Sequence, residues 1–268
     1  MKNKLLKLLS VLIFILIALV GILYFFQEKL IFFPTKLAAD YRFTCTQPFE
    51  EISINTTGNT KLNSLLFKAD SSKGVIFYLH GNAGALDTWS DIAKTYTDLH
   101  YDLFILDYRG FGKSEGNIHS EKQFYDDVQA AYDVIKQRYT KNKIVIIGYS
   151  IGTGPAAMLA AHNQPKLLIL QAPYYSLTDM MQQIYPVIPT FLLKYKFKTC
   201  EFVKQTKAPI VIFHGNNDEV IYYGSSVKLK KFLKPSDTLI TLDRQTHNGI
   251  TDNPDYLCEL NTILNGIH

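Results

Sequence analysis

The sequence predicts a mostly parallel, doubly wound α/β domain that is preceded by a single membrane-spanning helix. Two observations predict this fold. After residue 40, short and continuous apolar runs alternate with amphipathic segments of helical period, as expected when helices cover both faces of a parallel sheet. Near the N-terminus, an almost unbroken apolar segment is long enough to cross a bilayer.

The composition is that of a folded body. The chain has 268 residues, of which 47% are hydrophobic and 19% charged, and this excludes a disordered, collagen-like or disulfide-stapled small protein. The formal net charge of +4 arises in residues 1–36, where five lysines face a single glutamate, and the charges of the remaining residues cancel. A neutral body has no basic stripe of the kind that a phosphate backbone requires, so nucleic acid is not an expected partner.

The N-terminal segment is predicted to be an uncleaved membrane anchor. Between Leu8 and Phe26 the only clearly polar residue is Ser10, and at about 1.5 Å per residue this segment approaches a hydrocarbon thickness of about 30 Å. A cleaved signal peptide has a shorter apolar region and small residues at its cleavage site, whereas this segment ends in bulky ones. We therefore assign residues 1–29 to a membrane anchor and residues 30–268 to the α/β domain.

The charges that flank the anchor predict its orientation. Lys2, Lys4 and Lys7 precede the apolar residues, whereas Glu28 and Lys29 cancel just after them. By the positive-inside rule, the N-terminus stays cytoplasmic and the α/β domain lies on the non-cytoplasmic side.

The α/β domain is predicted to begin with an antiparallel hairpin of residues 49–55 and 61–68, because turn-forming residues separate these two runs. Buried strands and helices then alternate along the chain. The strands are expected at 74–79, 102–107, 143–148, 166–170, 209–213 and 238–242, and the helices at 87–99, 120–139, 151–162, 224–233 and 254–267.

One long connection breaks this alternation. Residues 173–208 hold three prolines and an apolar run from Ile184 to Leu193. One interpretation is a short cap over the end of the sheet, because long connections in compact domains often have a function. The other interpretation is a helix with a proline turn that only connects two strands.

The cysteines and histidines form no pattern typical of a metal site. Cys45, Cys200 and Cys258 are far apart and include no closely spaced pair. We expect buried free thiols; the alternative is one bridge from Cys258 to Cys45 or to Cys200 in an oxidising compartment. Neither a metal nor an organic cofactor is expected.

A candidate nucleophile lies directly after the strand at 143–148. The sequence Gly148-Tyr-Ser-Ile-Gly152 joins this strand to a helix that is rich in small residues. A serine at such a sharp turn needs glycine two residues away on both sides, because the strand and the helix pack too closely for Cβ atoms. This position predicts Ser150 as the nucleophile, and the alternative is a structural turn whose serine caps the helix.

A serine nucleophile requires a base, and the base requires a carboxylate that holds its ring. On this type of fold the chain order is serine, acid, histidine. Asp218 follows the strand at 209–213, and His247 follows the strand at 238–242. Both are therefore expected at the same carboxyl edge of the sheet as Ser150.

Other acids and histidines compete for these roles. Glu219 is adjacent to Asp218, and Asp179 follows the preceding strand, so both are alternative acids. His80 and His214 each end a strand and precede glycine, and we interpret them as hydrogen-bonded turn residues.

Two backbone N–H groups are expected to bind the negative oxygen that develops on an attacked carbonyl. One belongs to Ile151, the residue after the nucleophile. The other comes from the loop His80-Gly-Asn-Ala-Gly84, where two glycines allow amides to point inward. We favour Asn82 as this donor, with Ala83 second.

These motifs together resemble the α/β-hydrolase superfamily, and within it the membrane-anchored serine hydrolases of the bud-emergence type and their α/β-hydrolase-domain-containing relatives. The resemblance extends from about residue 25 to the end of the chain. It implies a catalytic triad of Ser150, Asp218 and His247, and an oxyanion hole of Asn82 and Ile151. The shared motifs follow an N-terminal anchor and are Leu30-Ile-Phe-Phe-Pro34, His80-Gly-Asn-Ala-Gly84, Asp107-Tyr-Arg-Gly-Phe-Gly-Lys-Ser-Glu-Gly116, Gly148-Tyr-Ser-Ile-Gly152, His214-Gly-Asn-Asn-Asp218 and Thr246-His-Asn248.

The expected function is hydrolysis of carboxylic ester or thioester bonds through an acyl-serine intermediate. The anchor and the apolar run of residues 184–193 favour acyl or lipid-like substrates at a membrane. Two alternatives stay open, a serine peptidase on the same fold and a membrane-anchored scaffold without catalysis.

Overall fold

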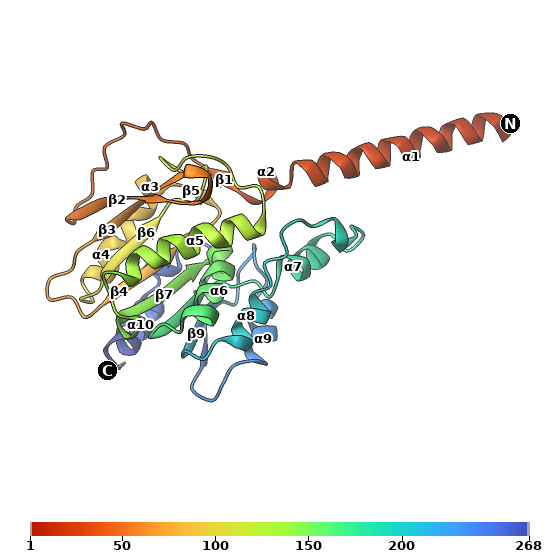
Figure 1. The fold of residues 1–268 in the computed structure, drawn as a ribbon. Helices are drawn as coiled ribbons and strands as arrows, with labels where there is room; N and C mark the ends of the chain where they lie inside the picture. The colour runs from red at the N-terminus through yellow and green to blue at the C-terminus, as the bar shows by residue number, and fades with distance from the viewer. Residues whose placement is uncertain (1, 267–268) are drawn as a thin grey trace.

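A central eight-stranded sheet organises the computed structural model, which describes residues 2–266 (Figure 1). Each strand lies within two residues of a run that the sequence predicts. The strands are β2 (Phe49–Asn55), β3 (Lys61–Phe67), β4 (Val75–Leu79), β6 (Asp102–Leu106), β7 (Ile144–Tyr149), β8 (Leu167–Gln171), β9 (Ile210–Gly215) and β10 (Thr238–Leu242).

The sheet is mostly parallel, as predicted. Its strand order is β10-β9-β8-β7-β4-β6-β3-β2, in which every neighbouring pair from β10 to β6 is parallel. At one edge of the sheet, β3 pairs antiparallel with β6, and β2 pairs antiparallel with β3. After β4 the chain adds β6 on one side of β4 and then β7 on the other side. The direction in which strands are added therefore reverses between β4 and β7. Ligands bind outside the carboxyl ends of the strands at such a reversal.

Alternate residues of each central strand pack into two separate cores. In β7, Ile144 and Ile146 belong to one core, and Val145 and Ile147 to the other. Helices cover both cores, which is why these strands are apolar along their whole length. The first core is covered by α5 (Glu121–Lys136), α6 (Thr153–Asn163), α8 (Thr199–Gln205) and α9 (Gly224–Lys230), and the second by α3 (Leu86–Trp89), α4 (Ala93–Thr97) and α10 (Pro254–Gly266).

The helix expected at 87–99 is broken. A 3₁₀ turn (Ser90–Ile92) separates α3 from α4. This stretch is rich in short polar side chains, and Thr88 donates its hydroxyl to the carbonyl of Ala85 at 3.1 Å. Such local bonds compete with a continuous helix.

The three cysteines are free thiols in the structure. Cys45 and Cys200 are half-buried, whereas Cys258 is exposed on α10. The expectation of buried thiols is therefore wrong for Cys258, which lies on the outer face of an amphipathic helix.

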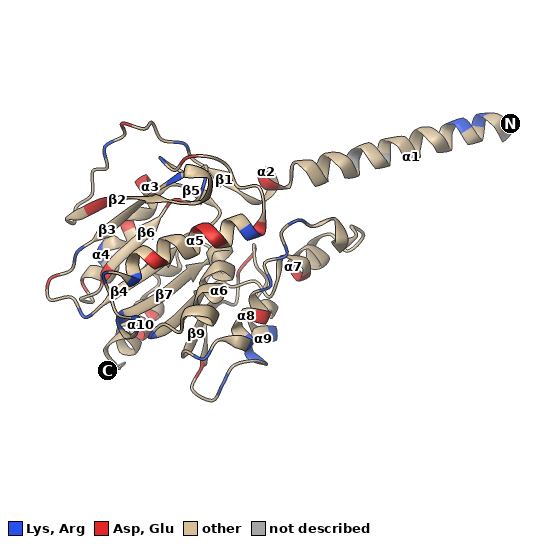
Figure 2. Ribbon diagram, in the orientation of Figure 1, with Lys and Arg blue, Asp and Glu red and all other residues tan. Residues whose placement is uncertain are grey.

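The N-terminal segment predicted to be an anchor forms a long helix that projects from the body, α1 (Lys2–Phe25) (Figure 1). Residues 3–25 are apolar enough to cross a membrane by length and composition, and their most apolar window is not buried against the body. Figure 2 shows basic residues at the N-terminal end of this helix and none along the turns that lead to the body. The predicted span runs from Leu8 to Phe26. The helix begins earlier, at Lys2, and ends at Phe25, one residue before the predicted end.

The segment that follows α1 packs closely on the body. After the short helix α2 (Gln27–Ile31), the strand β1 (Phe33–Pro34) pairs in parallel with β5 (Ala83–Gly84). The N–H of Phe33 donates to the carbonyl of Asn82 at 2.8 Å, and the side chain of Phe32 is buried in the first core. The pairing of β1 with β5 was not predicted from the sequence.

The connection between β8 and β9 has two parts. Its second part, α8, packs against α6 as an ordinary covering helix. Its first part holds α7 (Leu177–Ile184) and a 3₁₀ turn (Thr190–Leu192), and it extends beyond the body on the side from which α1 leaves (Figure 1).

Candidate active site

Ser150 lies at a strained turn between β7 and α6. Its φ angle is +53°, a left-handed conformation that side chains other than glycine rarely adopt. A Cβ atom on Gly148 would lie 2.5 Å from the carbonyl oxygen of Gly152, and one on Gly152 would collide with the carbonyl of Leu79. Both glycines are therefore required by packing, for the reason that the motif predicts.

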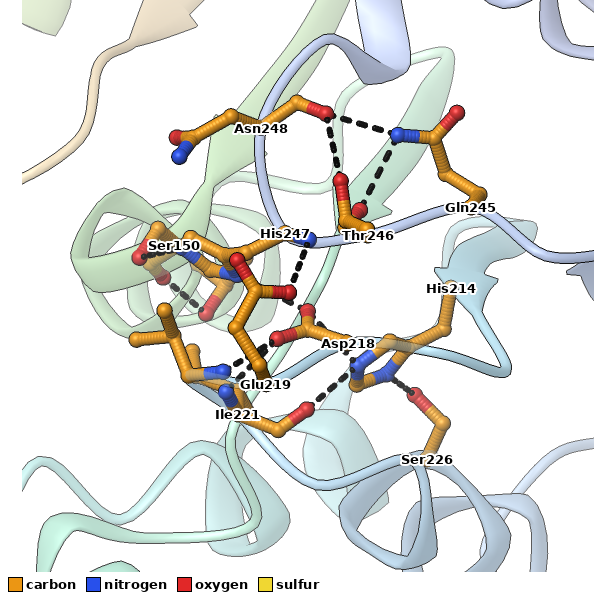
Figure 3. Close-up of polar contacts among 12 residues, drawn as sticks. Ser150, His214, Asp218, Glu219, Ile221, Ser226, Gln245, Thr246, His247 and Asn248 are labelled. Atoms are coloured by element: carbon orange, nitrogen blue, oxygen red, sulfur yellow. Dashed lines mark hydrogen bonds and ion pairs between the residues drawn. The ribbon is translucent and has the colours of Figure 1, made fainter.

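The structure brings Ser150, His247 and Asp218 together (Figure 3). His247 Nε2 lies 3.0 Å from Ser150 Oγ, and His247 Nδ1 lies 2.8 Å from Asp218 Oδ2. An ionised carboxylate only accepts hydrogen bonds, so Nδ1 carries the proton and Nε2 accepts the hydroxyl hydrogen of the serine. The three residues thus form one continuous chain of hydrogen bonds from the serine through the imidazole to the carboxylate.

The carboxylate of Asp218 is buried but well supplied with donors. The N–H groups of Val220 and Ile221 donate to Oδ1 at 2.9 and 2.8 Å. Burial by itself would raise the pKa of Asp218, but the hydrogen bonds from His214, His247 and Ile221 hold that pKa well below its ordinary value. Asp218 is therefore negatively charged at neutral pH.

His214 is a second imidazole that contacts Asp218, and the sequence pattern did not predict this contact. Its Nε2 lies 2.9 Å from the carbonyl of Ile221 and 3.2 Å from Asp218 Oδ2. Its Nδ1 lies 2.6 Å from Ser226 Oγ (Figure 3). The short spacing between His214 and Asp218 in one loop is the signal that points to this contact.

Several groups fix the backbone of His247. The carboxylate of Glu219 accepts its N–H at 3.1 Å, and the hydroxyl of Tyr149 donates to its carbonyl at 2.8 Å. The ring of Tyr149 also packs against the imidazole, with centroids 5.5 Å apart. Gln245 closes the turn by donating to the carbonyl of Asn248 at 2.7 Å. Glu219 thus contacts the main chain of His247 and not its ring.

The remaining candidates lie elsewhere. Asp179 accepts the hydroxyl of Tyr222 at 2.6 Å and pairs with Lys228, which ties α7 to α9. His80 lies beneath the loop after β4, where its ring stacks on Trp89 and its Nδ1 is 2.7 Å from the carbonyl of Gly81.

The two expected oxyanion donors lie in the same cavity as Ser150. Ile151 is in the first turn of the helical segment, where N–H groups have no partner within the helix. The side-chain amide of Asn82 is occupied, because it donates to the carbonyl of Ile31 at 3.0 Å. Its backbone N–H has no acceptor within residues 2–266, so this group remains available for an oxyanion.

The cavity beside Ser150 is small and apolar. Its volume is about 150 Å³, less than the roughly 300 Å³ at which drug-sized pockets begin. In the described part of the chain, no charged side chain lines it. The lining residues are Leu30, Ile31, Asn82, Ser150, Ile151, Tyr174, Leu177, Met180, Val220 and Ile221.

Comparison with known proteins finds related hydrolases. The sequence pattern of a family described as serine aminopeptidase, S33, matches residues 70–201. The chain is 32% identical over 224 residues to the protein bem46 of Schizosaccharomyces pombe, and the alignment covers 77% of this chain and 74% of bem46. It is 30% identical over 187 residues to the lysophosphatidylserine lipase ABHD12 of Macaca fascicularis, with 62% of this chain and 47% of that lipase covered. The chain therefore spans about half the length of that lipase.

Solved esterases share the fold. An esterase of Pyrococcus furiosus superposes with a TM-score of 0.69 at 17% identity, over 88% of this chain and 98% of the esterase. Est1E of Butyrivibrio proteoclasticus, solved with ferulic acid, gives a TM-score of 0.63 at 22% identity, over 80% of this chain and 96% of Est1E. At these identities the likeness concerns the fold alone.

Proposed function

The chain belongs to the α/β-hydrolase family that includes bem46, and from this premise we propose that it is a membrane-anchored serine hydrolase. It cleaves carboxylic ester or thioester bonds of acyl or lipid-like substrates through an acyl-serine intermediate. The observation that carries the proposal is the continuous chain of hydrogen bonds from Ser150 through His247 to Asp218. No metal or organic cofactor takes part in the proposed reaction.

Acylation follows from this chain of bonds. Ser150 Oγ attacks the acyl carbon while His247 Nε2 takes up the hydroxyl proton, and the charge of Asp218 stabilises the resulting imidazolium. The backbone N–H groups of Ile151 and Asn82 bind the oxyanion. The loss of one such donor costs about 3 kcal/mol of transition-state stabilisation in other serine hydrolases. His247 then passes its proton to the departing alcohol or thiol, which leaves the acyl group on Ser150.

Deacylation repeats these steps with water. His247 removes a proton from a water molecule as that water attacks the acyl carbon, and the proton returns to Ser150 Oγ when the ester bond breaks. The products are a carboxylic acid and the restored enzyme.

The substrate class is inferred from the surroundings of Ser150. An uncharged, apolar cavity favours the acyl part of an ester. The lysophosphatidylserine lipase among the relatives and the anchor α1 agree with a lipid-like substrate.

A serine peptidase is the second candidate, because the matching family is described as serine aminopeptidase, S33. An aminopeptidase binds a positively charged substrate amine, and the cavity lining described above offers no carboxylate for it. Matched ester and amide substrates with the same acyl group separate these two activities.

Residues 1–29 anchor the hydrolase domain of residues 30–268, with the N-terminus in the cytoplasm and the domain on the other side. The lysines before the apolar segment support this orientation. An alkaline phosphatase fused to the C-terminus would be active in this orientation and inactive in the opposite one.

The decisive experiment treats the detergent-solubilised full chain with a fluorophosphonate probe. Peptide mass spectrometry should find the adduct on Ser150, and His247→Ala should label far more slowly. Ser150→Ala should abolish labelling, whereas Ser236→Ala, at an exposed serine that precedes β10 while His247 follows that strand, should label like the wild type. An unlabelled wild-type chain with an intact circular dichroism spectrum would favour the non-catalytic scaffold instead.

A further inference from the structure

The first part of the β8–β9 connection ends in an exposed apolar surface, residues 184–191, which we call the cap tip. Val187 is 90% and Phe191 79% exposed, and Ile184 and Tyr185 are exposed as well. No charged residue occurs in the cap tip, and Figure 2 draws it without blue or red. Contiguous apolar surface of this kind marks a contact with another molecule or with a membrane.

The cap tip is held in a fixed position relative to the anchor. Gln27, which lies two residues after the last residue of α1, is buried against the chain that follows the cap tip. Its side-chain amide donates to the carbonyl of Leu192 at 2.7 Å and accepts the N–H of Lys194 at 2.9 Å. These two bonds join the end of the anchor to the end of the cap tip.

Lys194, which follows the cap tip, contacts the last turn of α1 and pairs with Glu28 at 3.3 Å. Its ammonium group lies 5.0 Å from the ring centroid of Tyr24 and 5.9 Å from that of Phe25, in the last turn of α1. Tyrosine and lysine at the end of a membrane span lie at the level of the lipid headgroups. Phe191 precedes Lys194 by three residues, and the cap tip extends on the side from which α1 leaves the body (Figure 1).

We propose that the cap tip lies in the same bilayer leaflet as the C-terminal end of α1, as a second contact of this protein with the lipid. The proposal depends on the anchoring part of the proposed function and not on catalysis. Interfacial segments bury their apolar face by about 5–10 Å and place basic residues among the headgroups. Lys196, five residues after the end of the cap tip, is exposed and makes no ion pair among residues 2–266, so its charge is free to contact a headgroup phosphate.

A lipid in this leaflet then has an apolar path to Ser150. Leu177 and Met180 line the cavity beside Ser150, and Ile184 belongs to the cap tip. These three residues of α7 are spaced at i, i+3 and i+7, so they form one stripe along the helix. The stripe leads an acyl chain from the leaflet toward the nucleophile without passage through water.

Fluorescence quenching tests this contact in the full chain, reconstituted in phosphatidylcholine vesicles with a fraction of anionic lipid. The chain contains a single tryptophan, so the wild type gives the background. Val187→Trp and Phe191→Trp report on the cap tip. Phe14→Trp, on α1, is the control within the membrane, and Leu257→Trp, on the distant helix α10, is the control in water.

Lipids brominated near the headgroup should reduce the tryptophan fluorescence of the two cap-tip variants, measured above the wild-type background, roughly twofold or more. Lipids brominated near the chain end should reduce it less, because interfacial burial is shallow. Phe14→Trp should be quenched most by the deep bromines, and Leu257→Trp by neither lipid. If Phe14→Trp is quenched and the cap-tip variants behave like Leu257→Trp, the leaflet contact is refuted while the anchor stands. If Phe14→Trp is not quenched either, the anchor itself is refuted.

Discussion

At the scale of single residues, the carboxylate of Asp218 is held more firmly than its contact with His247 alone would require. Two backbone N–H groups bind one of its oxygens, and the imidazoles of His214 and His247 approach the other. These contacts offset the cost of burying a charge. The carboxylate of Asp218 is thereby kept ionised and directed toward His247.

The pKa of Asp218 makes its contribution to stability depend on pH. Because the pKa in the folded protein lies below the unfolded value of about 3.9, the contribution is complete above pH 5 and declines as the pH falls further. We expect the difference in Tm between the wild type and Asp218→Asn to shrink from pH 5 to pH 3 in detergent. Asp243→Asn, at an exposed aspartate, is the control and should change Tm little. A difference that widens over this range would contradict the depressed pKa.

Glu219 is expected to position His247 without exchanging protons itself. In Glu219→Ala the N–H of His247 loses its charged acceptor, a bond of about 1.5 kcal/mol. The value of kcat should therefore fall roughly tenfold with KM and the pH profile unchanged. The control is Glu201→Ala on the outer face of α8, which should keep the wild-type kcat. A changed pH profile in Glu219→Ala would instead make this carboxylate part of the proton transfer.

At the scale of elements, the turn from β7 into α6 leaves no room for a side chain at Gly152. Gly152→Ala should force the turn away from the carbonyl of Leu79, and overpacking of this kind costs about 1–3 kcal/mol. We expect a Tm lower by several degrees and slower fluorophosphonate labelling of Ser150. Gly266→Ala, where a Cβ meets nothing within 4 Å, should change neither. Normal labelling in Gly152→Ala would show that the turn tolerates a side chain.

The same elements show what the sequence could predict. The strands followed from continuous apolar runs, and Ser150, Asp218 and His247 were placed together because each follows a parallel strand whose carboxyl end lies at one edge. The pairing of β1 with β5 could not be predicted, since two-residue strands carry no periodicity. The contacts of Tyr149 and Glu219 with His247 also join segments far apart in the sequence, which only the tertiary fold brings together.

At the scale of the whole molecule, Gln27 links the end of α1 to the chain that follows the cap tip. In Gln27→Ala two partly buried hydrogen bonds are lost, so this region should open more often. Trypsin should then cleave after Lys194 or Lys196 roughly tenfold faster, since about 1.4 kcal/mol changes an opening equilibrium tenfold. Gln182→Ala, at an exposed residue of α7, serves as the control and should be cleaved at the wild-type rate. Equal acceleration in both variants would mean that Gln27 does not fasten the cap tip.

The parallel pairing of β1 with β5 decides how much of the chain a water-soluble version must keep. The ring centroid of Phe32 lies 5.6 Å from that of Phe124 and 5.7 Å from that of Tyr195, and the N–H of the next residue, Phe33, bonds to the carbonyl of Asn82. A chain that begins at Gln27 should therefore stay folded and label at Ser150, whereas one that begins at Ala38 should melt several degrees lower and label slowly. Equal melting and labelling of the two would refute this. The smallest part of the chain that folds alone thus includes the segment between α1 and the central sheet. A truncation that kept only the central sheet and its helices would remove Phe32, which is part of the core.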